Sequence, residues 1–172
     1  DPVKVGSLDY SEYSEYYWTK FTHDGKKLVC YSYDTSAIDV WDYKSKEFIN
    51  RYQPGGKINY DSLSVSPIEE LIAFGHGNRG EIILYDIKTN QSRKLFHANL
   101  ENSINMTTFS EDGRLIAGSD SKNVYIWDIE SGLIIDEIEI IQGNGSIGGI
   151  GFIPGTRQLA IAYQTFIEVW NE

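Results

Sequence analysis

The stretch Asn123-Val124-Tyr125-Ile126-Trp127-Asp128 ends in an apolar residue, an aromatic residue and an acid, and this ending recurs along the chain. The matching segments are Val40-Trp41-Asp42, Leu84-Tyr85-Asp86, Ile126-Trp127-Asp128 and Val169-Trp170-Asn171. Their aromatic residues lie 44, 42 and 43 residues apart. A fixed period in this range is the sequence signature of repeat architectures, so the chain consists of four related units.

A second landmark keeps the same phase in each unit. It is a turn sequence that follows an apolar residue, as in Phe21-Thr22-His23-Asp24-Gly25 and Phe109-Ser110-Glu111-Asp112-Gly113. The leading apolar residues of the four units are Phe21, Val65, Phe109 and Phe152. Seven residues later in each unit comes another apolar residue, in turn Leu28, Ile72, Ile116 and Leu159.

Short segments rich in β-branched and aromatic residues fill the space between these landmarks and predict strands. In the third unit we expect strands at Ile104–Phe109, Arg114–Gly118, Asn123–Asp128 and Leu133–Ile138. Asp112-Gly113 and Ser131-Gly132 supply turns between them. No segment shows a sustained helical period, and the sequence therefore predicts an all-β fold.

These units resemble WD repeats, in which a turn of the Ser-Pro-Asp-Gly type follows the first strand and a Trp-Asp pair ends the third. The resemblance covers essentially the whole chain and implies a β-propeller of four-stranded antiparallel blades. The blades are expected at residues 16–52, 59–95, 104–138 and 147–172, as a single domain over 1–172.

The resemblance also sets expectations where the sequence departs from the family pattern. Tyr85 replaces the Trp of the second unit, and Asn171 replaces the Asp of the fourth. No Gly-His pair precedes the first strand of a unit, and the loop acids Asp34 and Asp120 lie seven residues before their Trp. We therefore expect the buried hydrogen-bond network of the family to be incomplete, with stability resting on apolar packing between blades.

The fourth unit has room for three strands, and Val3–Leu8 alternates like a strand that could complete it. The resemblance implies closure by strand exchange between the termini, which would hide an open sheet edge. Three arrangements remain open: a four-bladed ring, a head-to-tail dimer with eight blades, or a piece of a longer propeller. We expect this chain to form part of a larger or oligomeric ring.

The overall charge excludes several classes of partner. Fifteen basic and 25 acidic residues give a net charge of −10, the wrong sign for binding nucleic acid or an anionic membrane surface. No apolar run approaches the roughly 20 residues that span a bilayer. The single cysteine, Cys30, suits a reducing compartment, so we expect a cytoplasmic or nuclear location.

Motifs that could carry chemistry are better explained by the repeat. Gly143–Gly148 matches Gly-x-Gly-x-x-Gly, but a strand-like segment follows where phosphate binding needs a helix N-terminus. The histidines His23, His76 and His97 stand in separate units without the spacing of a zinc site. No Gly-x-Ser-x-Gly elbow occurs. The sequence thus predicts no catalytic residue, no metal and no cofactor.

One segment is unusual, the run of alternating acids and aromatics from Asp9 to Trp18. We expect Tyr16 and Trp18 to lie in the blade interface and the acids to face water. The candidate partner contacts are Tyr10, Glu12, Tyr13 and Glu15. Exposed aromatic rings beside carboxylates suit a basic protein or peptide.

The sequence therefore predicts a non-catalytic platform for protein–protein interaction, with self-association through Val3–Leu8 as a further possibility. The family resemblance implies scaffold roles in multiprotein complexes. The alternative is a propeller enzyme, a hydrolase or a metal-dependent enzyme, with its site in loops around the central axis.

Overall fold

A computed structural model describes residues 7, 15–56, 58–77, 80–96, 102–140 and 146–171, without the side chains of residues 60, 61 and 96. Every helix or strand in these ranges is a β-strand, which confirms the all-β fold class. Strands of the first two sheets are β1 (Tyr16–Phe21), β2 (Lys27–Ser32), β3 (Ala37–Asp42), β4 (Phe48–Tyr52), β5 (Ile58–Val65), β6 (Leu71–His76), β7 (Glu81–Asp86) and β8 (Gln91–Phe96). Those of the last two are β9 (Met106–Phe109), β10 (Leu115–Ser119), β11 (Asn123–Asp128), β12 (Ile134–Glu139), β13 (Gly149–Phe152), β14 (Leu159–Ala162) and β15 (Ile167–Trp170).

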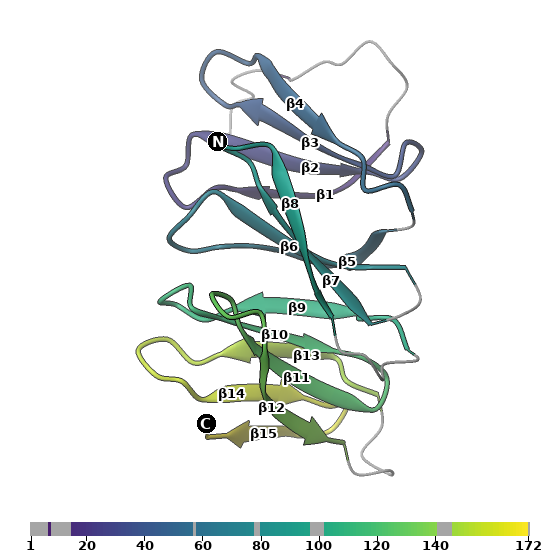
Figure 1. Cartoon of the computed structure of the whole chain (residues 1–172), viewed down its shortest axis with the longest axis vertical. Coiled ribbons are helices and arrows are strands. Elements are labelled where there is room, and N and C mark those ends of the chain that lie inside the picture. The colour runs from purple at the N-terminus through teal and green to yellow at the C-terminus, as the bar shows by residue number, and fades with distance from the viewer. Residues whose placement is uncertain are drawn as a thin grey trace, which may run out of the picture.

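Each sheet is an antiparallel meander in which neighbours in sequence are neighbours in space (Figure 1). Three sheets have four strands, and the fourth has three, β13, β14 and β15, among the described residues. Short turns suffice to join antiparallel neighbours, so every blade is built from local hairpins. No helix in the described part of the chain is long and apolar enough to cross a membrane.

The register of the hairpins explains why the sequence landmarks keep a constant spacing. In the third sheet Ile116 lies opposite Phe109 on one side and Trp127 on the other. Because directly opposed residues of an antiparallel pair point to the same face, the three form one row across the blade. The corresponding rows are Phe21–Leu28–Trp41, Val65–Ile72–Tyr85 and Phe152–Leu159–Trp170.

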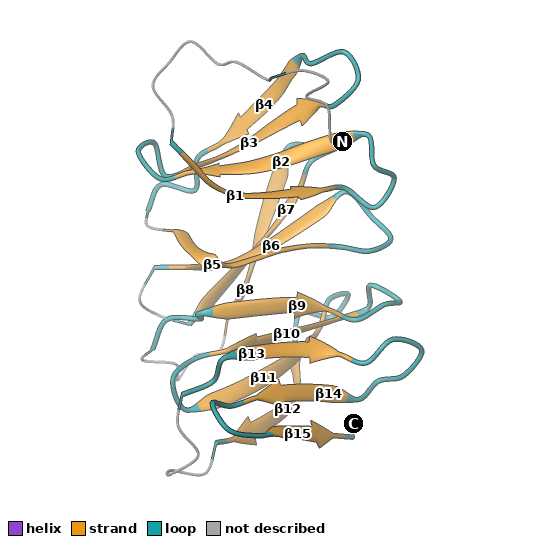
Figure 2. Cartoon of the chain, turned by 180° about the vertical axis from the view of Figure 1, so that it is seen from behind, coloured by secondary structure: helices purple, strands orange, loops and turns teal. Residues whose placement is uncertain are grey.

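The first strands of the four sheets form the innermost layer. β1 lies against β5, β5 against β9, and β9 against β13. Figure 2 shows these four strands following one another along the molecule, with the other strands of each sheet splayed away from them. This radial arrangement is that of part of a β-propeller.

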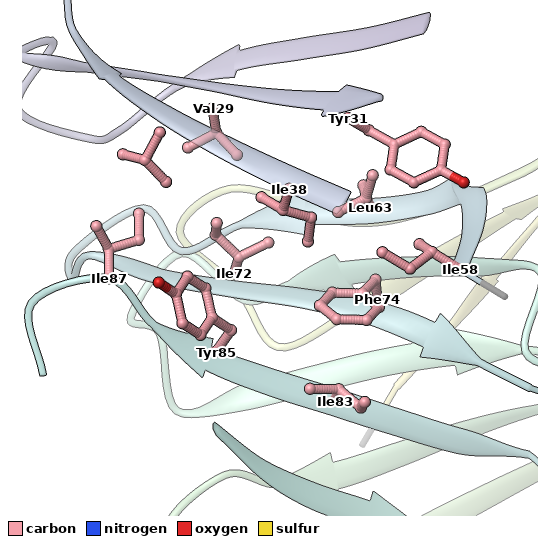
Figure 3. Packing of buried hydrophobic residues seen from close by; sticks show 11 residues of the cluster. Val29, Tyr31, Ile38, Ile58, Leu63, Ile72, Phe74, Ile83, Tyr85 and Ile87 are labelled. Carbon is pink, nitrogen blue, oxygen red and sulfur yellow. The ribbon is translucent and has the colours of Figure 1, made fainter. Parts of the chain in front are cut away.

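The core is divided among the spaces between adjacent sheets. Between the first two sheets, Val29, Ile38 and Val40 pack against a second set that includes Phe74 and Tyr85 (Figure 3). Similar clusters lie between the second and third sheets and between the third and fourth. Burial of this apolar surface is the main stabilising term, and each blade depends on its neighbours for it.

The strands of the third unit agree closely with those expected from the sequence. The expected segment Asn123–Asp128 is β11 itself, and the other three strands differ at their ends by at most two residues. The proposed closing strand Val3–Leu8 lies outside the described residues, apart from residue 7. It therefore stays a prediction.

Candidate interaction surface

The acids that follow the repeat aromatics stabilise turns through hydrogen bonds. One carboxylate oxygen of Asp42 accepts hydrogen bonds from the backbone N–H groups of Lys44 and Ser45, at 2.9 and 2.8 Å. Asp86 accepts from Lys88 and Thr89 in the same way, and Asp128 accepts from the N–H and hydroxyl of Ser131. Backbone N–H donation from Ser45 and Ser131 lowers the pKa of Asp42 and Asp128, because it stabilises the charged form.

The turn after the first strand uses a hydroxyl and a second carboxylate. Ser110 donates its hydroxyl to Asp112 at 2.7 Å and accepts from the N–H of Leu115 at 2.9 Å. Thr22 and Asp24 repeat the arrangement in the first blade. These contacts leave the repeated acids with a structural role, since each is engaged by backbone groups of its own turn.

The family's buried hydrogen-bond network is incomplete in the third blade, as the sequence predicts. The indole N–H of Trp127 and the hydroxyl of Ser119 are buried without a hydrogen-bond partner. Asp120 instead accepts the N–H groups of Lys122 and Asn123 within its own loop. Trp127 is held by apolar packing in the cluster between the second and third sheets.

A buried ion pair in the first blade was missed by sequence reasoning. Arg51 donates to both carboxylate oxygens of Asp39, at 2.7 and 2.9 Å, and the Tyr16 hydroxyl donates to the same carboxylate at 2.8 Å. Tyr16 therefore lies on the face of the first sheet that points away from the second blade, in contrast to our prediction. Trp18 packs in the interface between the two blades, as predicted. Burial raises the pKa of the neighbouring Cys30 thiol to about 12, so the thiol stays protonated.

The residues considered for metal or phosphate binding do not come together. His76 lies 3.3 Å from Glu81 across one hairpin, His23 is in an exposed turn, and His97 lies outside the described residues. Within the described ranges no three His, Cys, Asp or Glu side chains form a group that could hold a metal ion. The strand β13 follows Gly148, as predicted in place of a phosphate-binding helix.

Of the four candidate contact residues, only Glu15 belongs to the described part of the chain. Its carboxylate accepts the Tyr17 hydroxyl at 3.0 Å, and its backbone N–H donates to Asp34 at 3.1 Å. Tyr17 and Tyr33 lie 5.4 Å apart between ring centroids and are 57% and 51% exposed. Tyr10, Glu12 and Tyr13 lie outside the described residues, and their role stays a prediction.

We call Glu15, Tyr17, Tyr33 and Asp34 the acidic corner. It joins the start of β1 to the loop after β2, and the backbone N–H of Tyr33 donates to the carbonyl of Glu15 to hold the two segments together. The hydrogen bond to the Glu15 carboxylate raises the pKa of Tyr17, so its hydroxyl stays protonated. Two exposed carboxylates beside two exposed rings can hold a cation through both charge and the ring face.

A groove lies at the opposite end of the innermost strands, with a volume of about 510 Å³. All four blades line it, because the last residue of each innermost strand contributes. These residues are Phe21, Val65, Phe109 and Phe152. The groove presents apolar and hydroxyl side chains beside Lys20 and Glu111. Its lining fits an apolar side chain better than an ionic ligand.

Comparison with known proteins finds relatives that carry similar repeats. No protein-family model matches the chain. The chain is 29% identical over 149 residues to WD repeat-containing protein 26 homolog of Drosophila melanogaster, an alignment covering 83% of the chain and 23% of that protein. It is 32% identical over 104 residues to Cross-pathway control WD-repeat protein 2 of Flammulina velutipes, covering 60% and 31%. The repeats of this chain are therefore similar in sequence to those of WD-repeat proteins.

The chain spans about a quarter to a third of the length of the curated relatives it matches. WD-repeat proteins are generally non-catalytic, and they generally bind other proteins. In this chain the Trp-Asp acids are engaged in turns, so candidate contacts must be sought among exposed residues outside the repeat landmarks. The acidic corner is such a group.

Proposed function

We propose that this WD-repeat chain is a protein-interaction scaffold whose first blade binds a basic segment of a partner protein. The observation that carries the proposal is the acidic corner, where exposed carboxylates and exposed tyrosine rings lie side by side. Blades packed on one another are rigid, and rigid loops lose little conformational entropy when they bind. The net charge of −10 favours a basic partner over an acidic one.

The chemistry of the corner defines the kind of segment it would accept. A Lys or Arg side chain would pair with Glu15 or Asp34 while its apolar stem lies on the Tyr17 ring. Tyrosine is enriched at interfaces because it offers a large contact area with few rotatable bonds. The neighbouring acids and tyrosines Tyr10, Glu12 and Tyr13 would extend the same surface.

A peptide-binding measurement tests the proposal directly. A fluorescent arginine- and lysine-rich peptide should bind the chain, and its affinity should fall as salt is raised, because screening weakens exposed ion pairs. The double variant Glu15→Lys with Asp34→Lys should abolish that binding. The control Glu130→Lys with Glu139→Lys makes the same change of net charge at exposed residues of the third blade. Equal loss in both variants would show a diffuse charge effect and contradict the proposed site.

The partner itself can then be sought in the source organism. Affinity capture with the wild-type chain should yield specific proteins that are lost with Glu15→Lys or Glu12→Lys. Retention of every captured protein by both variants would exclude a role for this region. We also propose a cytoplasmic or nuclear location, which the single, buried Cys30 supports.

A further inference from the structure

Two sets of equivalent positions surround the groove at the ends of the innermost strands, and both change residue type from blade to blade. The next-to-last residues of these strands are Lys20, Ser64, Thr108 and Gly151. The second residues after the strands are His23, Pro67, Glu111 and Pro154, in turns that lie along one side of the molecule (Figure 2). All of them except Gly151 line the groove. The repeat landmarks keep their residue types because each has the same structural task, so the varying positions of these turns are the ones available for recognition.

The walls of the groove are set by contacts between described blades. Lys20 lies opposite Val29, which belongs to the cluster between the first and second sheets, so Lys20 points toward the second blade. Thr108 lies opposite Ala117, which belongs to the cluster between the third and fourth sheets. Phe109 packs between the second and third sheets. The groove therefore does not depend on the outward faces of the first and last sheets.

One part of the groove is apolar. Its apolar side chains include Val65, Phe109 and Phe152, of which Phe109 is 8% exposed and the other two are half-buried. The hydroxyl oxygens of Ser64 and Thr107 lie 2.6 Å apart beside them, and Thr107 donates its own proton to a backbone carbonyl oxygen. Because both hydroxyls are already engaged, this part of the groove favours an apolar side chain.

A cation lies at the first-blade end of the groove. Within the described residues, the side chain of Lys20 makes no hydrogen bond or ion pair. The neighbouring acids are engaged elsewhere, since Asp24 pairs with Lys26 at 3.2 Å and Glu111 accepts the backbone N–H of Gly155. The groove thus combines an apolar wall with an ammonium group that has three donors to offer.

We propose that this groove binds an extended segment of a partner protein that carries an aromatic or large aliphatic side chain and, further along, a Glu or Asp. The apolar side chain would lie on Val65, Phe109 and Phe152, and the carboxylate would pair with Lys20. Since Lys20 belongs to the first blade and the two Phe rings to the third and fourth, the segment would run across the second blade.

Charge complementarity selects this occupant. The unpaired charge in the groove is positive, although the net charge of the chain is −10. The proposal does not rest on the acidic corner, because that surface lies at the other end of β1 and would accept a basic segment.

Short peptides test the groove directly. Each carries one Phe and one Glu separated by one to four Gly or Ser residues, with acetylated and amidated ends so that the Glu supplies its only carboxylate. In nitrogen–proton correlation spectra of the full chain, at least one spacing should shift the amide signals of Lys20, Ser64 and Thr108 in a saturable manner. Replacing the peptide's Glu by Gln, or its Phe by Ala, should raise the dissociation constant at least about threefold.

A charge reversal in the chain locates the contact. Lys20→Glu should raise the dissociation constant of the Glu peptide at least about fivefold, because repulsion replaces attraction, and should change that of the Gln peptide less than about twofold. The control Lys122→Glu makes the same change at an exposed residue of the third blade outside the groove and should leave binding unchanged. Near-ultraviolet circular dichroism matching that of the wild type shows that both variants are folded.

Three results would overturn the proposal. They are the lack of a saturable shift with every spacing, equal binding of the Glu and Gln peptides, and equal loss of binding in Lys20→Glu and Lys122→Glu. An arginine- and lysine-rich peptide should still bind the Lys20→Glu chain at the acidic corner, so failure of one site is distinguishable from failure of the other.

Discussion

The third and fourth blades share one repeat sequence but differ in what surrounds them. Trp127 of the third blade is fully buried, whereas Trp170, at the same position of the fourth, is 38% exposed. Both residues end a row across their sheet in the same register. The environment of a repeat position is therefore decided by the neighbouring blades as much as by its own residue. Paired substitutions in the two blades can separate these contributions.

The largest difference is expected for the repeat tryptophans. Trp127→Ala should lower the free energy of unfolding by about 3–5 kcal/mol, because it leaves a large cavity in a packed cluster. Trp170→Ala should cost less than about 2 kcal/mol, since its ring already meets solvent. Urea unfolding followed by circular dichroism measures both. Similar costs at the two sites would show that the fourth blade is as well covered as the third.

The variant Trp127→Phe sharpens the same comparison. It should cost much less than Trp127→Ala, because the indole N–H has no hydrogen-bond partner to lose. If Trp127→Phe costs as much as the alanine variant, the indole makes a hydrogen bond and the buried network is more complete than the structure indicates.

Two strand glycines give the next effect. A Cβ atom at Gly118 would lie 2.9 Å from the Ile82 side chain and 3.2 Å from that of Trp127. Gly118→Ala should therefore destabilise the chain by about 1–3 kcal/mol through overpacking. Gly151→Ala in the fourth blade should be neutral or slightly stabilising, since nothing lies within 4 Å. Thermal unfolding distinguishes the two, and an equal loss for both would contradict the open space beside Gly151.

A smaller effect is expected for the turns after the first strands. Ser110→Ala removes the acceptor of the Leu115 N–H in a buried turn and should cost about 1–2 kcal/mol. Thr156→Ala in the corresponding turn of the fourth blade alters exposed contacts and should cost less than about 0.5 kcal/mol. Urea midpoints report the difference. A larger loss of stability in Thr156→Ala than in Ser110→Ala would contradict this prediction.

The smallest effect is a dependence on pH. The pKa values of Asp42, Asp112 and Asp128 are lowered in the folded chain by hydrogen bonds within their turns. An unfolded Asp protonates near pH 3.9, so the stability these groups contribute is present above about pH 4 and is lost as the pH falls through their folded pKa values. Asp42→Asn and Asp128→Asn keep a side-chain acceptor but cannot titrate. Their urea midpoints should fall less between pH 6 and pH 3 than that of the wild type, and an unchanged fall would exclude the turns as its source.

Much of the fold could be predicted because the constant repeat length identifies equivalent positions in the four units. Once Phe109, Ile116 and Trp127 are recognised as equivalent to their counterparts, the strands between them are confined to a few residues. The buried pair of Asp39 and Arg51 could not be found in this way, because a charged residue in an apolar strand gives no sign of its partner. It requires the register of β3 and β4.

The candidate site was less accessible to sequence reasoning. Glu15 was identified from the alternation of acids and aromatics, but Tyr33 and Asp34 were missed as its neighbours. They follow β2, and only the pairing of Tyr16 with Ser32 brings them beside Glu15. The register of the β1–β2 pair shifts by one residue between Tyr16 and Trp18. A regular hairpin extended back from its turn would therefore place Tyr16 opposite Tyr33 and not opposite Ser32.

Several contacts between blades join residues about one repeat apart. Lys27 pairs with Glu70 and Ser64 with Thr107, each 43 residues along the chain, and Asn59 meets Asn105 after 46. A nascent chain would therefore need only its most recent repeat to dock each new one. At roughly 5–20 residues per second, a ribosome would supply a further blade about every 2–9 seconds. Assembly of this protein can thus proceed in step with translation, each finished blade serving as the template for the next.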